Sequence, residues 1–110
     1  MQLPNNAAAY VPEEKLINYL LNMDHPIGGS KARLLAGHGF TIANAHAFAA
    51  ALQRLAAQNP VASRQQTSHG LKFIVDGDLP TPRGTTLRIR SVWIIDRGGT
   101  APRLVTAYPQ

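Results

Sequence analysis

Residues 86–96 read TLRIRSVWIID, and apolar side chains recur at every second position through most of this stretch. This alternation is typical of a β-strand with one buried face, because successive side chains point to opposite sides of a strand. The predicted buried face carries Leu87, Ile89, Trp93 and Ile95. Arg88 and Arg90 fall on the other face. Trp93 is therefore expected in the core rather than as a stacking platform for a base.

Three further stretches around this one also have strand character, and turn residues separate them. Leu71, Phe73 and Val75 share one face of an alternating run. The predicted strands are VASRQQT (61–67), LKFIVDG (71–77), the run at 86–96 and PRLVTAYP (102–109), with a turn at 68–70 and loops at 80–84 and 98–102. Strands that follow one another through short turns form an antiparallel meander.

The first 60 residues have helical periodicity instead. Pro12 suits the first turn of a short helix that continues to Asn22, and Ser30 is placed to cap a second helix that ends at glycines 37 and 39. Thr41 is placed to cap a third helix. Its apolar stripe, spaced i, i+3, i+4 and i+7 and ending before Pro60, is Ala45, Phe48, Ala49, Leu52, Leu55 and Ala56.

The sequence thus predicts an α+β fold, with about three N-terminal helices packed on a C-terminal four-stranded antiparallel sheet. At 110 residues, 45% of them hydrophobic, the chain (1–110) has the size of a single domain. Residues 1–9 are expected to be loosely held. The sequence predicts a soluble chain, because no apolar run is long enough to span a bilayer and the start lacks the features of a signal peptide. Cysteine is absent, so disulfides and thiolate metal sites are excluded.

The charge is basic and unevenly distributed. The net charge is +5, with a pI near 10.3. Seven of the eleven basic residues but only three of the six acidic residues follow residue 62. Such an excess is compatible with a polyanionic partner, either a nucleic acid or an acidic protein.

The connection between the first two helices is richer in chemistry than a linker requires. Residues 23–35 read MDHPIGGSKARLL. Backbone N–H groups of Gly28, Gly29 and Ser30 at a helix start, the ammonium of Lys31 and the imidazole of His25 could form an anion site. The alternative is a plain helix–helix turn, whose glycines relieve strain and whose lysine is solvated.

Metal and nucleotide chemistry have little support in the sequence. His38 is expected to help end the second helix, and His46 to be solvated. The best carboxylate pair is Asp76 and Asp78, but no histidine spacing completes a metal site. Neither a phosphate-binding glycine loop nor a nucleophile elbow is present. We therefore expect no metal and no cofactor.

The order and spacing of several motifs resemble a small bacterial domain family of unknown function. They are LPN at the start, YLLN followed by HP and a glycine, a KA segment opening the next helix, RIRSVWII, and PRLVTAYP at the end. The resemblance extends from Leu3 to Pro109. The sequence ARLLAGHGF departs from it, because relatives carry aromatic residues after KA, and this affects packing detail only.

The order of helices and strands is also similar to the barnase, EndoU, colicin and RelE-like ribonuclease toxins. This resemblance implies metal-independent endoribonuclease action on RNA in the cytoplasm, by a domain delivered within a larger polypeptide or paired with an immunity or antitoxin protein. Attack by a ribose 2′-hydroxyl needs a base, an acid and donors for the phosphate. The implied catalytic residues are His25 as base or acid, Lys31 and Arg90 on the phosphate, and Thr106 and Tyr108 as hydroxyl donors. Gly29, Ser30, Arg88 and His69 are the implied substrate-binding residues.

Other interpretations remain open at the level of sequence. The VTAYP strand could merely complete the core, with Thr106 buried and Tyr108 at its rim. The chain could also be a non-catalytic module that binds nucleic acid, or one that binds an acidic immunity or antitoxin partner. No membrane partner is expected.

Overall fold

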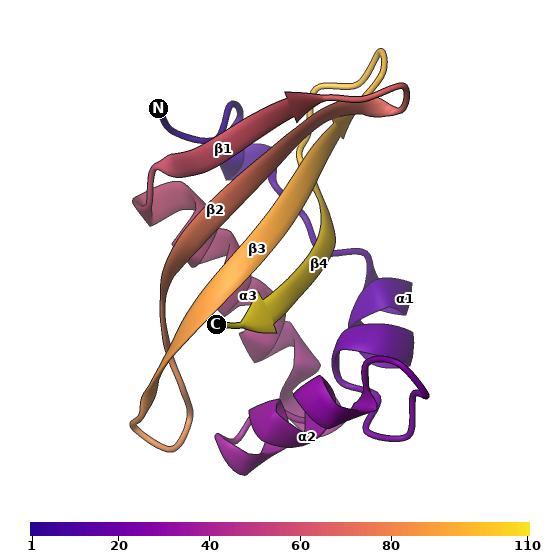
Figure 1. Ribbon diagram of the computed structural model, residues 1–110. Helices are drawn as coiled ribbons and strands as arrows, with labels where there is room; N and C mark the ends of the chain where they lie inside the picture. Colours follow the sequence, from indigo (N-terminus) through magenta and orange to yellow (C-terminus); the bar gives the residue numbers. More distant parts are fainter.

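The chain folds as a helical half followed by a four-stranded sheet, and the computed structural model describes all 110 residues (Figure 1). The N-terminal elements are η1 (Asn6–Ala8), α1 (Glu13–Lys15) and η2 (Leu16–Leu20). They precede α2 (Gly29–Gly37), η3 (Ile42–Asn44) and α3 (Ala45–Gln58). The strands are β1 (Val61–Gln66), β2 (Gly70–Pro80), β3 (Thr86–Asp96) and β4 (Arg103–Pro109). The predicted α+β fold is confirmed.

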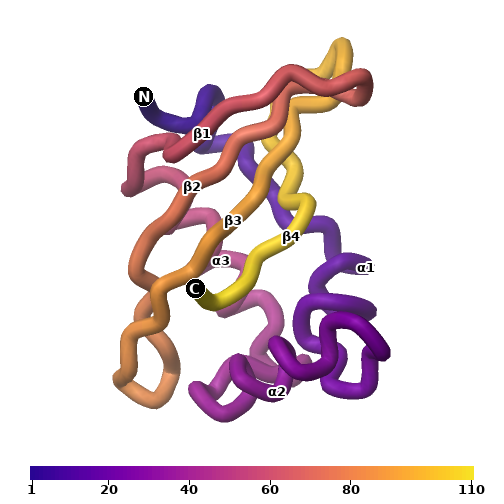
Figure 2. The backbone as a smooth tube through the Cα atoms, in the orientation of Figure 1, coloured from indigo at the N-terminus to yellow at the C-terminus, as the bar shows by residue number.

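The sheet is an antiparallel meander in which each strand pairs with its neighbours in sequence, in the order β1-β2-β3-β4. Phe73 of β2 lies opposite Trp93 of β3, and both are fully buried under the helices. Asp76 lies opposite Arg90, and this pair is on the other face, because three positions along a strand reverse the side. No helix covers that second face, which we call the open face (Figures 1 and 2).

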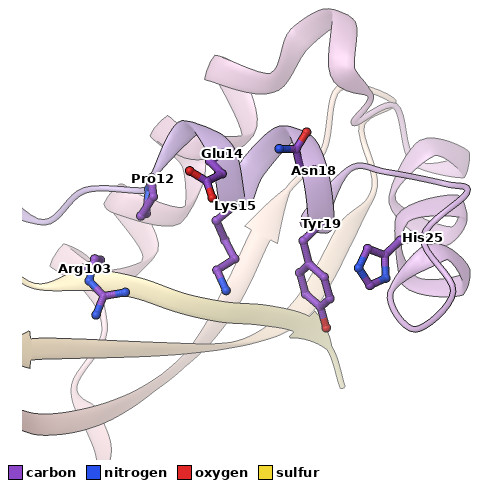
Figure 3. Close-up of a pocket in the computed structure, with 7 residues that line it drawn as sticks. All are labelled: Pro12, Glu14, Lys15, Asn18, Tyr19, His25 and Arg103. Carbon is purple, nitrogen blue, oxygen red and sulfur yellow. The ribbon is translucent and has the colours of Figure 1, made fainter. Parts of the chain in front are cut away.

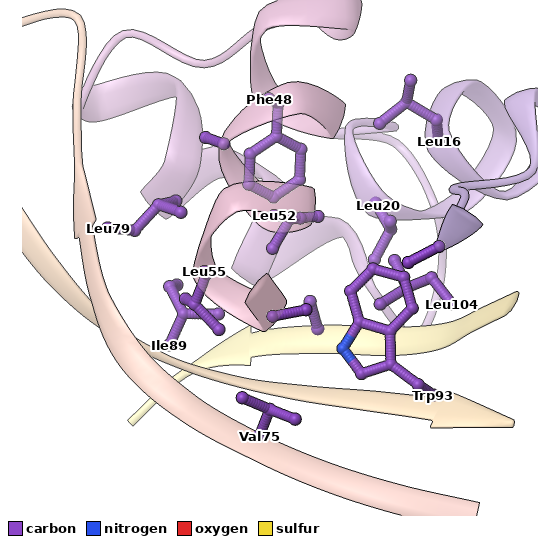
Figure 4. Packing of buried hydrophobic residues seen from close by; sticks show 14 of the residues in the cluster. Leu16, Leu20, Phe48, Leu52, Leu55, Val75, Leu79, Ile89, Trp93 and Leu104 are labelled. Atoms are coloured by element: carbon purple, nitrogen blue, oxygen red, sulfur yellow. The ribbon is translucent and has the colours of Figure 1, made fainter. Parts of the chain in front are cut away.

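The core lies between α3 and the sheet (Figure 4). Phe48, Leu52 and Leu55 form the buried stripe of α3, as its spacing predicts. They belong to one cluster with Phe73 and Trp93. Burying each such side chain contributes about 1.5–3 kcal/mol. This packing fixes which face of the sheet is inside.

The third helix begins as expected after Thr41. The backbone N–H of Thr41 donates to Oδ1 of Asn44 at 2.8 Å, and η3 then leads directly into α3. His46 on α3 is exposed, as predicted. The longest helix, α3, has 14 residues, and no helix combines the length and apolarity that crossing a bilayer requires.

The first helix is shorter and wider than a regular α-helix. A single α-turn, α1, passes into the π-helical η2, in which the N–H of Leu21 donates to the carbonyl of Leu16, five residues earlier. Leu16, Leu20 and Leu21 are all buried. These leucines thus pack into the core, although the backbone is π-helical over Leu16–Leu20 and not a regular α-helix as far as Asn22.

Residues 1–9 contact the rest of the domain. Leu3 is 1% exposed, and the backbone N–H of Val61 donates to the carbonyl of Met1. These contacts differ from the loosely held segment expected from the sequence, because a leucine side chain near the N-terminus reaches the core.

Two consecutive buried hydrogen bonds connect the Trp93 side chain through Ser91 to the neighbouring strand β2. Its indole N–H donates to Oγ of Ser91 at 2.8 Å, and the Ser91 hydroxyl donates to the carbonyl of Val75 at 2.7 Å. Trp93 and Ser91 are both 0% exposed. A buried indole N–H without an acceptor is costly, so Ser91 is the residue that allows tryptophan at this position.

We expect Ser91→Ala to lower the free energy of unfolding by about 1–3 kcal/mol, because it leaves the indole N–H without an acceptor. Urea unfolding followed by tryptophan fluorescence measures this change. Ser63→Ala, at an exposed position on β1, is the control and should leave stability nearly unchanged. Equal effects of the two substitutions would contradict the role given to Ser91.

Candidate functional site

The register of β4 decides where the predicted hydroxyl groups lie. Tyr108 is opposite Arg90, and Thr106 is opposite Val92, across the β3–β4 pair. Directly opposed residues share a face, so Thr106 and Tyr108 lie on the open face with Arg90. Both are partly exposed. The alternative in which this part of β4 only completes the core therefore applies to Leu104 and Ala107, which are buried, and not to the two hydroxyl residues.

Arg90 is tied to a carboxylate of the neighbouring strand. Its Nε and Nη2 donate to the two carboxylate oxygens of Asp76, both at 2.9 Å. This bidentate contact lowers the pKa of Asp76 and raises the pKa of Arg90. Arg90 therefore carries a charge that Asp76 already balances, and Tyr108 also helps to raise its pKa.

Arg88 lies further along the same face and is more weakly paired. Its Nη1 is 3.4 Å from Oδ1 of Asp78, and both side chains are more than half exposed. An exposed pair of this kind contributes little to stability. Asp78 and Asp76, the carboxylates considered as a metal pair, each face an arginine instead. No group of three or more histidine, cysteine or acidic side chains is arranged to hold a metal ion.

Lys31 connects α2 to the end of β4. Its Nζ lies 4.8 Å from the centre of the Tyr108 ring, within the range of a cation–π contact. Since Tyr108 is opposite Arg90, three of the predicted catalytic residues, Lys31, Tyr108 and Arg90, follow one another along the open face. Thr106 is two residues away on the same strand.

His25 has a structural role that the sequence did not indicate. Its Nδ1 accepts the backbone N–H groups of Ile27 and Gly28, both at 3.1 Å, so the ring caps the turn that leads into α2. A nitrogen that accepts two bonds carries no proton, and the neutral ring then has its proton on Nε2. His25 is therefore arranged to donate a hydrogen bond from Nε2, which fits the binding of an oxyanion better than the role of base or acid, because a neutral ring does not give up its remaining proton.

The predicted anion-binding backbone is largely occupied. The N–H of Gly28 donates to the His25 ring, and the N–H of Gly29 donates to the His25 carbonyl at 2.9 Å. Gly29 also cannot gain a side chain, because a Cβ there would lie 2.6 Å from the carbonyl oxygen of Met23. The prediction that Ser30 caps α2 is wrong. Ser30 lies in the first turn of α2, where its N–H makes no protein hydrogen bond.

The remaining predicted residue, His69, is not brought to the others. It lies in the turn between β1 and β2, at the end of the molecule opposite to α2 (Figure 1). Its carbonyl accepts the N–H of Arg97. The sequence places His69 in a turn, but a turn position does not indicate at which end of the sheet the residue lies. His38 directly follows α2, as expected, and its Nδ1 is 2.7 Å from the hydroxyl of Thr85.

A pocket of about 450 Å³ opens between the α1–η2 segment and β4 (Figure 3). The side chains of Lys15 and Tyr19 point from the helix toward β4, and the His25 ring lies beside Tyr19. The two rings meet edge to face, with centres 4.9 Å apart. The complete lining is Pro12, Glu14, Lys15, Asn18, Tyr19, His25 and Arg103.

Six of these seven residues were not predicted as site residues. Tyr19 begins the YLLN motif, but the sequence indicated no site role for it, nor for Glu14, Lys15 or Arg103. Their positions depend on how α1 packs along β4, and no local pattern encodes this. Arg103 donates to both carboxylate oxygens of Asp96, at 2.8 and 3.1 Å, which lowers the pKa of Asp96. Glu14 and Lys15 have no ion-pair partner.

Comparison with known proteins agrees with this architecture. The family model for a domain of unknown function, DUF6883, matches residues 2–110. The chain belongs to the DUF6883 family. The predicted resemblance to a domain family of unknown function is thus confirmed. None of the curated protein sequences compared with this DUF6883 domain matches it.

One solved structure resembles this DUF6883 domain over nearly its whole length. It is a chain of a contact-dependent growth inhibition toxin–immunity protein complex from Klebsiella pneumoniae 342. The TM-score is 0.73 at 18% sequence identity, and the match covers 96% of this chain and 97% of the other. At this identity, the likeness establishes a shared fold and not a shared activity.

The Asp76–Arg90 pair predicts a pH dependence of stability. The pKa of Asp76 is below its unfolded value of about 3.9, so the stabilisation is present above that pH and is lost as the pH falls through the folded value. We expect Asp76→Asn to reduce the loss of unfolding free energy between about pH 5 and pH 2. Urea unfolding at a series of pH values measures it. An equal reduction in Asp78→Asn would contradict the assignment to this pair.

Proposed function

We propose that this domain is a metal-independent endoribonuclease of the toxin type, which cleaves RNA by attack of a ribose 2′-hydroxyl on the adjacent phosphodiester. The observation that carries the proposal is the arrangement around β4. A pocket along the edge of β4 holds a carboxylate, an imidazole and a free ammonium group. Tyr108 and Thr106 lie on the open face of the sheet, and Nζ of Lys31 lies over the Tyr108 ring.

The pocket supplies a proton acceptor and a hydrogen-bond donor. Glu14 is exposed and unpaired, so its carboxylate is available to take the 2′-hydroxyl proton. His25 presents Nε2–H as a donor, because its Nδ1 is used in the cap. In this scheme the 2′-oxygen bonds to phosphorus, the bond from phosphorus to the 5′-oxygen breaks, and a 2′,3′-cyclic phosphate and a 5′-hydroxyl result.

Cations and hydroxyl groups next to the pocket suit the charge that gathers on the phosphate. Lys15 is in the pocket, and Lys31 lies against Tyr108. We assign Lys31 and Tyr108 to the leaving 5′-oxygen, which must gain a proton, and Thr106 to a non-bridging oxygen. Arg90 is held by Asp76 and presents the N–H groups that Asp76 does not use toward the substrate.

The fold and the charge support a particular biological setting. The structural neighbour is part of a toxin–immunity complex, and this domain carries a net charge of +5. Both properties suit a toxin domain that acts on RNA in the cytoplasm of a target cell after delivery within a larger polypeptide, and that an acidic immunity protein blocks.

A second candidate function is binding without catalysis, to nucleic acid or to an acidic immunity or antitoxin protein. One observation favours it: three arginines near β4 already pair with aspartates, so the site has fewer free cations than its sequence suggests. This candidate predicts salt-dependent binding to RNA that stays uncut, or a tight complex with an acidic protein.

His25→Asn tests the catalytic role of the imidazole separately from its role as a cap. An asparagine oxygen can accept the two backbone N–H groups as Nδ1 does, but the side chain lacks the Nε2–H donor. We expect folding to be retained and RNA cleavage to fall by about a hundredfold or more. Cleavage of total RNA in EDTA and growth after induced expression are the measurements.

His69→Asn is the matched control for that experiment, because it makes the same change in a histidine at the far end of the sheet. We expect His69→Asn to cleave RNA at the wild-type rate. If His25→Asn also keeps the wild-type rate while circular dichroism and unfolding are normal, the pocket is not the reactive centre.

Lys31→Met tests the cation at the open face. Methionine keeps an unbranched apolar side chain against Tyr108 but removes the charge. We expect a loss of cleavage of about tenfold or more at low salt, with normal folding. Arg83→Met is the control, since it removes one exposed positive charge from the β2–β3 loop. Equal losses in both variants would mean that net charge alone matters, which favours the non-catalytic candidate.

A further inference from the structure

A second hollow lies on the open face of the sheet, apart from the pocket that contains His25. Its volume is about 230 Å³. Three neighbouring strands and the end of β4 provide its lining, which is Ser63, Gln65, Lys72, Ile74, Val92 and Tyr108. It is smaller than the 300–1,000 Å³ typical of sites for drug-sized ligands, so it suits a fragment of about the size of one aromatic heterocycle.

The strand register explains why a hollow forms on a face that no helix covers. Ile74 is paired with Ser63 on β1 and with Val92 on β3, so the two aliphatic side chains lie side by side. Gln65 and Lys72 form the next opposed pair on one side of them. Tyr108, opposite Arg90, stands on the other side. Long side chains thus enclose a short aliphatic floor, and Val92 is only 7% exposed.

The lining matches the chemistry of a nucleobase. Ile74 and Val92 offer an apolar surface for a flat ring, and Tyr108 offers an aromatic ring on which a base can stack. Gln65 and Lys72 make no hydrogen bond or ion pair through their side chains, so an amide and an ammonium are free at the rim. A heterocycle with polar edges satisfies both parts of this lining.

Tyr108 joins this hollow to the proposed reactive centre. The ring lines the hollow, and the ammonium of Lys31 lies 4.8 Å from the ring centre. We propose that the hollow is a base-binding subsite, which holds one nucleobase of the RNA while its phosphate lies toward Lys31. This inference rests on the proposed ribonuclease function for its substrate class.

The rim also favours a particular edge of the base. Lys72 is a donor without acceptor capacity, and lysine donates well to O6 and N7 of guanine and to the equivalent oxo groups of other bases. Gln65 can donate and accept, so it does not discriminate by itself. We therefore expect guanine or uracil, which carry an oxo group at the corresponding position, to bind better than adenine or cytosine.

The experiment uses the full chain and the 3′-monophosphates of guanosine, uridine, adenosine and cytidine as probes. We expect NMR shifts at Lys72, Ile74, Val92 and Tyr108, with the tightest binding for the guanosine or uridine nucleotide. Lys72→Met should weaken that binding about tenfold and reduce its preference over the other two nucleotides. Gln65→Leu should weaken binding of all four.

Arg64→Met is the matched control, because Arg64 lies between Ser63 and Gln65 on β1 but is opposite Phe73, on the other face of the sheet. It should change nucleotide binding only slightly. RNA cut by the wild type and mapped by sequencing should show the same base preference at a fixed position from the cut, and Lys72→Met should cut with less preference.

The experiment distinguishes failure of the base subsite from failure of the ribonuclease function. If the wild type cleaves RNA but the nucleotides shift only residues outside the hollow, the subsite is wrong and the ribonuclease function stands. If the nucleotides bind in the hollow but RNA stays intact, the base site stands and the ribonuclease function fails. Equal weakening by Arg64→Met and Lys72→Met, or occupation of the hollow by an acidic protein but by no nucleotide, would overturn the subsite.

Discussion

The pairing of β2 with β3 is the constraint on which the rest of the molecule depends. Phe73 and Trp93 are opposed and fully buried, so the inner face of the sheet is settled by the largest apolar side chains of the chain. Because side chains alternate, Asp76 and Arg90 must then lie outside. A shift by one residue would expose the tryptophan and bury the arginine. The open face and its chemistry are therefore a consequence of core packing.

This dependence explains how much could be predicted from the sequence. The period-two pattern around Trp93 and the helical stripe around Phe48 gave the fold class and the faces, because both arise from local alternation against a common core. The register between β3 and β4 could not be predicted in this way. Whether Tyr108 would share a face with Arg90 depends on the register, which includes an irregularity between Val92 and Trp93 that no pattern reveals.

The candidate site was predicted least well where local and tertiary roles compete. His25 was expected to be free, but its Nδ1 is used by the backbone at the start of α2, a role that the sequence assigned to Ser30. Glu14 reaches the same pocket from the first turn of α1, where a carboxylate also suits the positive end of a helix. In both cases a residue with one evident function has a second one, visible only after α1 and α2 are packed.

The basic residues around β4 are of two kinds: arginines that pair with aspartates, and lysines that form no ion pair. Arg88, Arg90 and Arg103 each face an aspartate on the same sheet, so part of their charge is already balanced. The chain has only three lysines, at positions 15, 31 and 72, and none forms an ion pair. One lines the pocket beside β4, one lies on Tyr108, and one borders the hollow on the open face.

The three lysines, none of which forms an ion pair, thus lie along one path that runs from the α1 pocket over the end of β4 to the open face. An ion-paired guanidinium has already given up part of its attraction for a phosphate, whereas an unpaired ammonium retains it. A polyanion would therefore be drawn to this path more strongly than the arginine-rich sequence of β3 suggests. The Asp–Arg pairs balance charge on the sheet, and the lysines remain free to contact a ligand.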